Sequence, residues 1–285
     1  MKPLQFLSVL LLSAAVAFGT VHFSGAPQTA SAPQKETRWE QIKKRGTLRC
    51  GYMVWPPFHM KDPNTGEMTG IMPDIMEAIA SQLGLKLEWT EEVDYAHMFS
   101  GYNRYDLACT PVTSNGSRVR ETDFSRDFGY TGLYGFVRAD DSRFDNDITR
   151  LNDPSVRVSL IDGEYSNIIV AEDFPKAQPV AITQMGNGSQ MILQVATKKA
   201  DFAITDPFSG QGFMENNPDS IKLVSKKPIR VLDLSLPIPH DEPAFKAAVD
   251  VTISNLSRIG ALDRIYRRYE RGIAKVIRVA KPYQE

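Results

Sequence analysis

Two residues of opposite charge, Arg118 and Asp206, each follow a strand-like run that ends in a loop. Arg118 closes the loop Thr-Ser-Asn-Gly-Ser-Arg at 113–118, and Asp206 closes the run Phe-Ala-Ile-Thr-Asp at 202–206. A guanidinium presents a planar fork that matches a carboxylate, and a carboxylate accepts hydrogen bonds from an ammonium group. At the edge of one cleft, the two side chains could therefore hold both ends of a free amino acid.

Each of these charges also has an ordinary structural interpretation. Arg118 could pair with Glu121 on a helix surface, an ion pair that would stabilise the fold only a little. Asp206 precedes Pro207, so it could be the N-cap of a helix. The sequence alone leaves both interpretations open.

The amino terminus predicts export. Lys2 precedes an apolar run over residues 4–23, and Ala30-Ser-Ala32 is a small-residue cleavage pattern, so residues 1–32 are expected to be a signal peptide. The apolar run is long for a signal peptide, and an uncleaved N-terminal anchor is the alternative. Either interpretation places the rest of the chain outside the cytoplasm.

Composition limits the kinds of partner and cofactor. The chain has 33 basic and 34 acidic residues and a formal net charge of −1, so no bias toward nucleic acid is expected. The four histidines lack the spacing of metal ligands, so no metal site is expected either. Export permits a disulfide between Cys50 and Cys109, but two buried, unpaired thiols fit the sequence as well.

The apolar patterning predicts two successive series of strands and helices. The first has strands at 48–52, 85–89 and 106–109, a turn at 62–66, a helix from Pro73 to Gly84 and a short helix at 96–101. The second has strands at 156–161, 179–182 and 202–205 and helices at 165–173 and 189–198. Residues 242–271 are predicted to be helical with a break at Gly260. Such alternation indicates open, largely parallel α/β sheets.

Two series of this kind suggest two lobes. Extended segments at 132–138 and 230–239 lie between the series and would form a two-strand hinge. The predicted boundaries are 38–137 plus 238–285 for the first lobe and 138–237 for the second. Ligands bind at the carboxyl ends of strands in such sheets, so the loops of both lobes should face one cleft.

The order of short motifs resembles the family 3 extracellular solute-binding proteins, the periplasmic amino-acid receptors of ABC importers. The resemblance covers residues 45–271 and rests on three segments in the expected order: 48–74 with Leu-Arg-Cys-Gly-Tyr and Pro-Pro-Phe, 105–125 with Tyr-Asp-Leu-Ala and Asp-Phe-Ser, and 200–206 with Ala-Asp-Phe-Ala-Ile-Thr-Asp. It implies a two-lobed periplasmic-binding-protein fold of type II, the Venus-flytrap fold.

The resemblance also assigns roles to individual residues. Arg118 matches the arginine that binds the ligand carboxylate, Asp206 the aspartate that binds the ammonium group, and Thr113 a hydroxyl residue near the carboxylate. The other positions that match the ligand site are Trp55 and Tyr95 as sandwiching aromatics, Tyr165 and Ser166 at a helix N-terminus, and Met72 as a pocket residue.

The chain departs from the family pattern at the ligand side chain and at the ligand carboxylate. Receptors for basic amino acids often have carboxylates in the segment matched by residues 52–55 and at the position of Met72, and this chain has neither. Glu164 stands where Thr or Ser is common, so a second acid would lie near the ligand carboxylate. Either Glu164 points away from the site, or the ligand is not a plain α-amino acid.

The implied function is capture of a zwitterionic ligand by lobe closure and its delivery to an ABC transporter in the membrane. The expected ligand is an amino acid with an uncharged or aromatic side chain, and the receptor is expected to be a periplasmic monomer without a cofactor. One alternative is a periplasmic cyclohexadienyl (arogenate or prephenate) dehydratase, for which Glu164 and His97 are the candidate general acids. Another is a sensor or accessory domain that serves no importer.

Overall fold

A computed structural model describes residues 36–145, 147–183 and 186–279. The predicted signal peptide or anchor over residues 1–32 lies outside these ranges. Within them, no helix has the length and apolar character needed to cross a membrane.

The first lobe, called lobe 1 below, is built on a three-stranded parallel sheet. Its central strand β1 (Thr47–Tyr52) lies between β4 (Lys86–Glu92) and β5 (Leu107–Ala108). Four helices belong to this lobe: α2 (Arg38–Arg45), α3 (Ile71–Gln82), α7 (Pro243–Arg258) and α8 (Ala261–Tyr269). The C-terminal helices return to lobe 1, as predicted, because the apolar face of α7 and α8 packs in the same core as α3.

Helix α3 begins two residues before the predicted start at Pro73. The backbone N–H groups of Ile71 and Met72 donate to the carbonyls of Pro57 and Phe58, at 3.0 and 2.9 Å. Gly70 makes this possible: its φ is +127°, and a Cβ there would lie 2.5 Å from the Pro57 carbonyl oxygen. The start of the helix is thus tied to the loop that carries Trp55.

The two cysteines settle the alternative that the sequence left open. Cys50 on β1 and Cys109 just after β5 form a disulfide, with their Cα atoms 5.4 Å apart. Both residues are fully buried in the core of lobe 1. The bond joins neighbouring strands directly beneath the loop that leads to Thr113.

The second lobe, lobe 2, is built on a six-stranded sheet. Its strand order is β11 (Ile221–Leu223), β7 (Gly129–Arg138), β10 (Phe202–Thr205), β8 (Arg157–Ile161) and β9 (Gln178–Ile182), and β12 (Arg230–Leu234) also pairs with β7. Strands β8, β9 and β10 are parallel, and β7 runs antiparallel to β10, β11 and β12.

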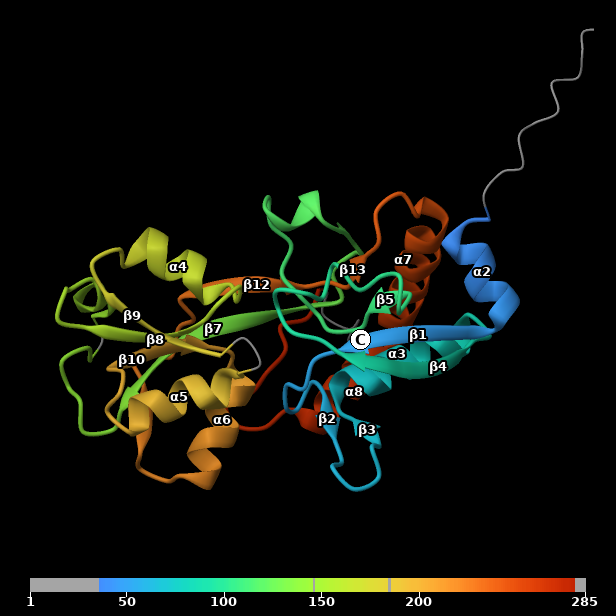
Figure 1. The fold of residues 1–285 in the computed structure, drawn as a ribbon. Coiled ribbons are helices and arrows are strands. Elements are labelled where there is room, and N and C mark those ends of the chain that lie inside the picture. Colours follow the sequence, from blue (N-terminus) through green and yellow to red (C-terminus); the bar gives the residue numbers. More distant parts are fainter. Residues whose placement is uncertain (1–35, 146, 184–185, 280–285) are drawn as a thin grey trace, which may run out of the picture. The chain divides into compact units, whose positions relative to one another are not determined.

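Helices cover both faces of this sheet (Figure 1): α4 (Ser166–Asp173) lies on one face, and α5 (Gly188–Ala196) and α6 (Pro207–Asn216) lie on the other. The alternation of side chains along β10 explains the two layers. Phe202 and Ile204 pack with Ile169 of α4, whereas Ala203 packs with Ile192 of α5.

The two extended segments predicted as a hinge pair with each other. β12 runs antiparallel to the first half of β7, from Arg230 opposite Leu133 to Leu234 opposite Gly129. On the lobe 1 side, β13 (Pro237–Ile238) pairs with β6 (Asp123–Phe124). The predicted boundary at residue 137 falls inside β7, whose second half belongs to the sheet of lobe 2.

The C-terminal segment, residues 273–277, also contacts the hinge, through backbone hydrogen bonds and apolar packing. Ile277 exchanges two backbone hydrogen bonds of 2.8 Å with Tyr130 of β7. Ile273 packs against the α5–α6 core of lobe 2, whereas Ala274 and Val276 are buried in the core of lobe 1. Residues 273–276 therefore lie between both cores.

One local prediction was wrong, two helices were missed, and one predicted turn is confirmed. Residues 95–104 form successive turns, with no helix at 96–101. The helices α2 and α6 were not predicted. The predicted turn at 62–66 is confirmed: it links β2 (Met60–Lys61) to β3 (Met68–Thr69), and the Asp62 side chain accepts hydrogen bonds from two following backbone N–H groups.

Candidate functional site

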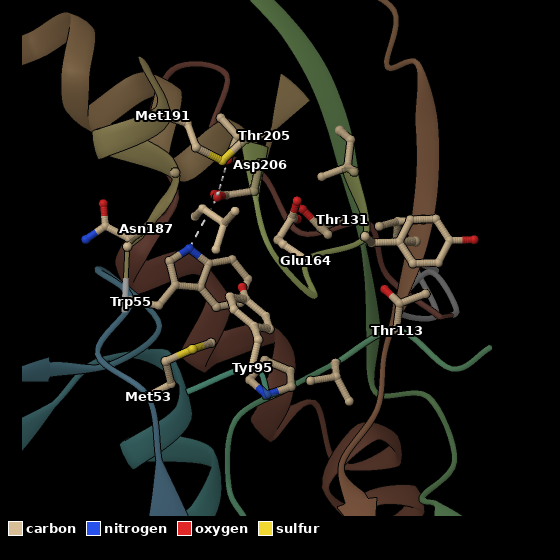
Figure 2. Close-up of a pocket in the computed structure, with 18 of the residues that line it drawn as sticks. Met53, Trp55, Tyr95, Thr113, Thr131, Glu164, Asn187, Met191, Thr205 and Asp206 are labelled. Atoms are coloured by element: carbon tan, nitrogen blue, oxygen red, sulfur yellow. Dashed lines mark hydrogen bonds between the residues drawn. The ribbon is translucent and has the colours of Figure 1, made fainter. Parts of the chain in front are cut away.

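A cavity is lined by loops and strand ends of both lobes (Figure 2). Six of the eight predicted site residues line it: Trp55, Tyr95, Thr113, Arg118, Tyr165 and Asp206. Ser166 and Met72 do not. The structure thus brings together residues from five separate stretches of the chain.

Arg118 begins the short 3-10 helix η1 (Arg118–Arg120) and is half-buried. Its Nη1 donates to the Thr113 carbonyl at 2.8 Å, and its Nη2 donates to the Gly163 carbonyl of lobe 2 at 3.0 Å. Among the described residues it forms no ion pair with any carboxylate, so the surface pairing with Glu121 is wrong. Burial lowers the pKa of Arg118 more than the nearby charges, among them those of Glu164 and Asp233, raise it.

Asp206 is both a helix cap and a wall of the cavity. Its Oδ1 accepts from the backbone N–H groups of Phe208 and Ser209, each at 2.9 Å, and so begins α6. Its Oδ2 accepts from the Ser209 hydroxyl at 2.7 Å and from the Trp55 indole N–H of lobe 1 at 3.2 Å. Burial raises the pKa of this carboxyl, although these hydrogen bonds act in the opposite direction.

Trp55 joins the lobes through its ring as well as through its N–H. Figure 2 shows the indole directed at Asp206. One face of the ring stacks on Phe58 with centroids 4.1 Å apart, and Phe58 in turn meets Phe208 of α6 edge-on at 5.3 Å. These contacts across the cleft describe a closed arrangement of the two lobes.

Tyr95 and Gly163 form another close approach between the lobes. Gly163 has a φ of +82°, and a Cβ there would lie 3.3 Å from the Tyr95 Cβ. Burial raises the pKa of the Tyr95 hydroxyl, and the charge of Glu164 adds to the effect, so the residue is neutral at ordinary pH.

Glu164 lines the cavity, so the possibility that it points away is wrong. Its Oε2 accepts from the Ser166 backbone N–H at 2.9 Å and from the Ser166 hydroxyl. The Ser166 N–H was expected to face a ligand carboxylate, but it donates to Glu164. Burial raises the pKa of the Glu164 carboxyl more than the Ser166 bonds and the Arg118 charge lower it.

Two predicted residues take structural positions. Met72 is fully buried in the core of lobe 1 and is not a cavity wall. The Thr113 hydroxyl lines the cavity, but it donates to the Asp233 carbonyl of the hinge strand β12 at 3.2 Å.

Sequence reasoning missed several cavity residues, and Figure 2 labels five of them: Met53, Thr131, Asn187, Met191 and Thr205. One had a detectable signal. Asn187 and Gln190 form a capping box at the start of α5, a pattern that four consecutive residues reveal. The other four reach the cavity through the tertiary arrangement of strands and helices, which no local sequence pattern reveals.

The structure also bears on metal and on the second candidate acid. The described residues contain no group of three His, Cys, Asp or Glu side chains placed to hold a metal ion. His97 is exposed, pairs with Asp94 at 2.8 Å and does not line the cavity. Of the two candidate general acids, only Glu164 faces the cavity.

Comparison with known proteins identifies the family and agrees with the fold. The sequence profile of the bacterial extracellular solute-binding proteins, family 3, matches residues 48–272. A probable amino-acid ABC transporter-binding protein of Haemophilus influenzae is 27% identical over 223 residues, which cover 77% of this chain and 78% of that protein.

Two solved structures show the same fold. The ancestral amino acid-binding protein AncCDT-1, a precursor of cyclohexadienyl dehydratase, matches with a TM-score of 0.73 at 24% identity, over 82% of this chain and 100% of that one. A cysteine-binding protein of Campylobacter jejuni matches with a TM-score of 0.72 at 17% identity, over 85% of this chain and 98% of that one. The predicted two-lobed, type II periplasmic-binding-protein fold is confirmed.

Proposed function

The chain belongs to the bacterial extracellular solute-binding proteins, family 3, and we propose that it captures an amino acid with an uncharged or aromatic side chain between its lobes. In this proposal it works in the periplasm as a monomer and delivers the ligand to the membrane subunits of an ABC transporter. The relative in Haemophilus influenzae is named as a probable binding protein of such a transporter.

The observation that carries the proposal is the state of Arg118. Among the described residues, this half-buried guanidinium faces a cavity and forms no ion pair, and the nearby charges of Glu164 and Asp233 do not offset the effect of its burial. Removing a charge from water is costly unless a counter-charge replaces the lost hydration. A ligand carboxylate would supply that counter-charge and would accept the N–H groups that the Thr113 and Gly163 carbonyls leave unused.

The other end of the ligand would meet Asp206. Its carboxylate is held in place by the cap of α6, so it offers a fixed negative charge to an ammonium group. Trp55 and Tyr95 would flank the ligand side chain. Asp206 and Glu164 are the two acidic residues of the described cavity lining. The described lining offers no further carboxylate to neutralise a cationic side chain beside these two rings.

Lobe closure would couple binding to transport. Arg118 and Trp55 of lobe 1 already contact Gly163 and Asp206 of lobe 2. A ligand that contacts both walls binds the closed state better than the open one, and that difference in affinity shifts the population toward closure.

The test is a thermal-shift screen with the twenty L-amino acids, followed by calorimetry with those that stabilise the protein. Arg118→Met should lower the affinity by about 100-fold or more, because a buried ligand carboxylate would lose its counter-charge. Arg120→Met is the matched control, since Arg120 is an exposed residue of the same turn. Equal affinities for the wild type and Arg118→Met would remove Arg118 from the site, and stabilisation by L-arginine alone would overturn the proposed ligand class.

A second candidate function is favoured by one observation, the position of Glu164. A carboxyl in the cavity with a raised pKa is what a dehydratase acting on a carboxylated ring would use as a general acid. Incubation of the purified protein with prephenate should give phenylpyruvate if this function is real. Absence of phenylpyruvate together with tight binding of an amino acid would leave the receptor function alone.

A further inference from the structure

The charges of the cavity are unequal. Of the described residues that line it, Arg118 carries the only positive charge, and Glu164 and Asp206 carry two negative ones. A zwitterion adds one charge of each sign, so the occupied cavity would keep an excess negative charge. Such an excess is unfavourable in a site that closes away from water.

The two carboxylates differ in how their oxygens are satisfied. Both oxygens of Asp206 accept hydrogen bonds, from Phe208, Ser209 and Trp55. These donors stabilise its charged form. Among the described residues, both hydrogen bonds to the Glu164 carboxylate go to Oε2 and come from Ser166. Among the described residues, Oε1 of Glu164 has no donor, so this atom is where a proton costs least.

We propose that Glu164 takes up one proton from solvent when the ligand carboxylate enters beside it, so that capture is proton-linked and selects ligands with no net charge. This inference rests on the proposed function and adds a specificity-determining residue to it. The proton binds Oε1, no covalent bond to the ligand forms, and the resulting O–H can donate to the ligand carboxylate. Glu164 then acts as a hydrogen-bond donor, and the occupied cavity is neutral.

The groups around Glu164 favour this step. Arg118 and Tyr95 face it from lobe 1, and Tyr165 and Asp206 face it from lobe 2. Burial and the Asp206 charge favour protonation, whereas the Ser166 hydrogen bonds and the Arg118 charge oppose it. The guanidinium would be engaged by the ligand carboxylate. Two carboxylates that share one cation cannot both stay charged at low cost, which is the situation of coupled acid pairs.

The sign of the pH dependence follows. The pKa of Glu164 is already raised by burial in the empty protein, and an entering carboxylate would raise it further. Affinity should be greatest at the acidic end and should be lost as the pH rises through the pKa of the occupied state. Where one proton is taken up per ligand, the affinity falls by about tenfold per pH unit.

The experiment measures the affinity of each L-amino acid that stabilises the wild type, between pH 5 and pH 8.5, for three proteins. The wild type should show the fall with pH. Glu164→Gln should bind with a flat profile, because glutamine supplies a permanent N–H donor without a charge. Glu172→Gln is the matched control: it lies exposed on α4, and its profile should follow the wild type.

Calorimetry of the wild type in phosphate and in Tris makes the proposal testable even if Glu164→Gln fails to fold. These buffers differ in ionisation enthalpy, so a difference in apparent binding enthalpy counts the protons taken up. A flat wild-type profile without proton uptake, or a slope that persists in Glu164→Gln, overturns the inference and leaves the proposed function standing. Failure of all twenty amino acids to bind at any pH overturns both.

Discussion

The two charged walls of the cleft are built in opposite ways. Asp206 is saturated with donors that the fold itself supplies: two backbone N–H groups, a serine hydroxyl and an indole. Arg118 donates only to two backbone carbonyls and meets no carboxylate among the described residues. The difference indicates that folding alone fixes the carboxylate wall, whereas in the proposed function an anionic ligand would complete the guanidinium wall.

The local structure explains this contrast. Asp206 lies between a buried strand and a helix, where an N-cap must satisfy the first N–H groups of α6 whether or not a ligand exists. Arg118 lies in a loop whose shape is set by Asn115, which accepts from the backbone N–H groups of Ser117 and Arg118 at 3.0 Å. The guanidinium donates to the Thr113 carbonyl at the start of this loop and to the Gly163 carbonyl across the cavity, so it caps no helix and keeps N–H groups for a ligand.

The largest expected effect on folding is at Asp206. Asp206→Ala removes the cap of α6 and leaves the Trp55 and Ser209 donors without their acceptor. The free energy of unfolding should fall by about 3 kcal/mol, of which the cap accounts for about 1 kcal/mol. Urea denaturation measures this loss. Asp206→Asn should lose less, because asparagine is an equally good cap, and equal losses for the two variants would show that the charge matters more than the cap.

Arg118→Met should behave in the opposite way. It removes a half-buried cation that forms no ion pair among the described residues, so the free energy of unfolding should stay within about 1 kcal/mol of the wild type or rise. The same urea titration measures it beside Asp206→Ala. A loss as large as that of Asp206→Ala would abolish the distinction between a wall fixed by folding and a wall completed by ligand.

The sequence could predict the order of strands and helices because their periodicities are local. It could not predict that residues 95–104 form turns, because the apolar side chains at positions 95, 98, 99 and 102 have helical spacing but pack in one cluster without forming a helix. The disulfide depended on β1 and β5 being neighbours, which no local pattern encodes. The sequence therefore left that pairing open.

The candidate site shows the same limit. Arg118, Asp206, Trp55 and Tyr95 reach one cavity because each follows a strand or loop that the pattern located. Met72 was misplaced, because it lies in the first turn of α3 and packs in the core of lobe 1 without lining the cavity. The direction of Glu164 could not be read from the sequence, because Ser166 holds it toward the cavity through a local contact.

A smaller effect is expected at the hydrogen bond between Trp55 of lobe 1 and Asp206 of lobe 2. Trp55→Phe removes the indole N–H that donates to Asp206 and keeps a ring that can stack on Phe58. The affinity for the amino acid should fall by about fivefold, which corresponds to about 1 kcal/mol for one hydrogen bond. Calorimetry measures it, and Trp39→Phe, on the outer helix α2, is the control. An unchanged affinity would mean that the ring contacts alone hold the two lobes together at this point.

The smallest effect is expected where the C-terminal segment contacts lobe 2. Arg271 pairs with Glu215 of α6 at 2.7 Å, but both side chains are exposed, so solvent screens the pair. Arg271→Gln should change the affinity by less than about twofold and the free energy of unfolding by less than about 0.5 kcal/mol.

Ile273→Ser is the informative partner, because Ile273 packs against the core of lobe 2 one residue before Ala274 enters the core of lobe 1. If the segment favours the closed state by apolar packing, Ile273→Ser should weaken ligand binding more than Arg271→Gln at every salt concentration. If instead Arg271→Gln weakens binding more than Ile273→Ser, and its effect disappears in high salt, the contact between the C-terminal segment and lobe 2 depends on charge.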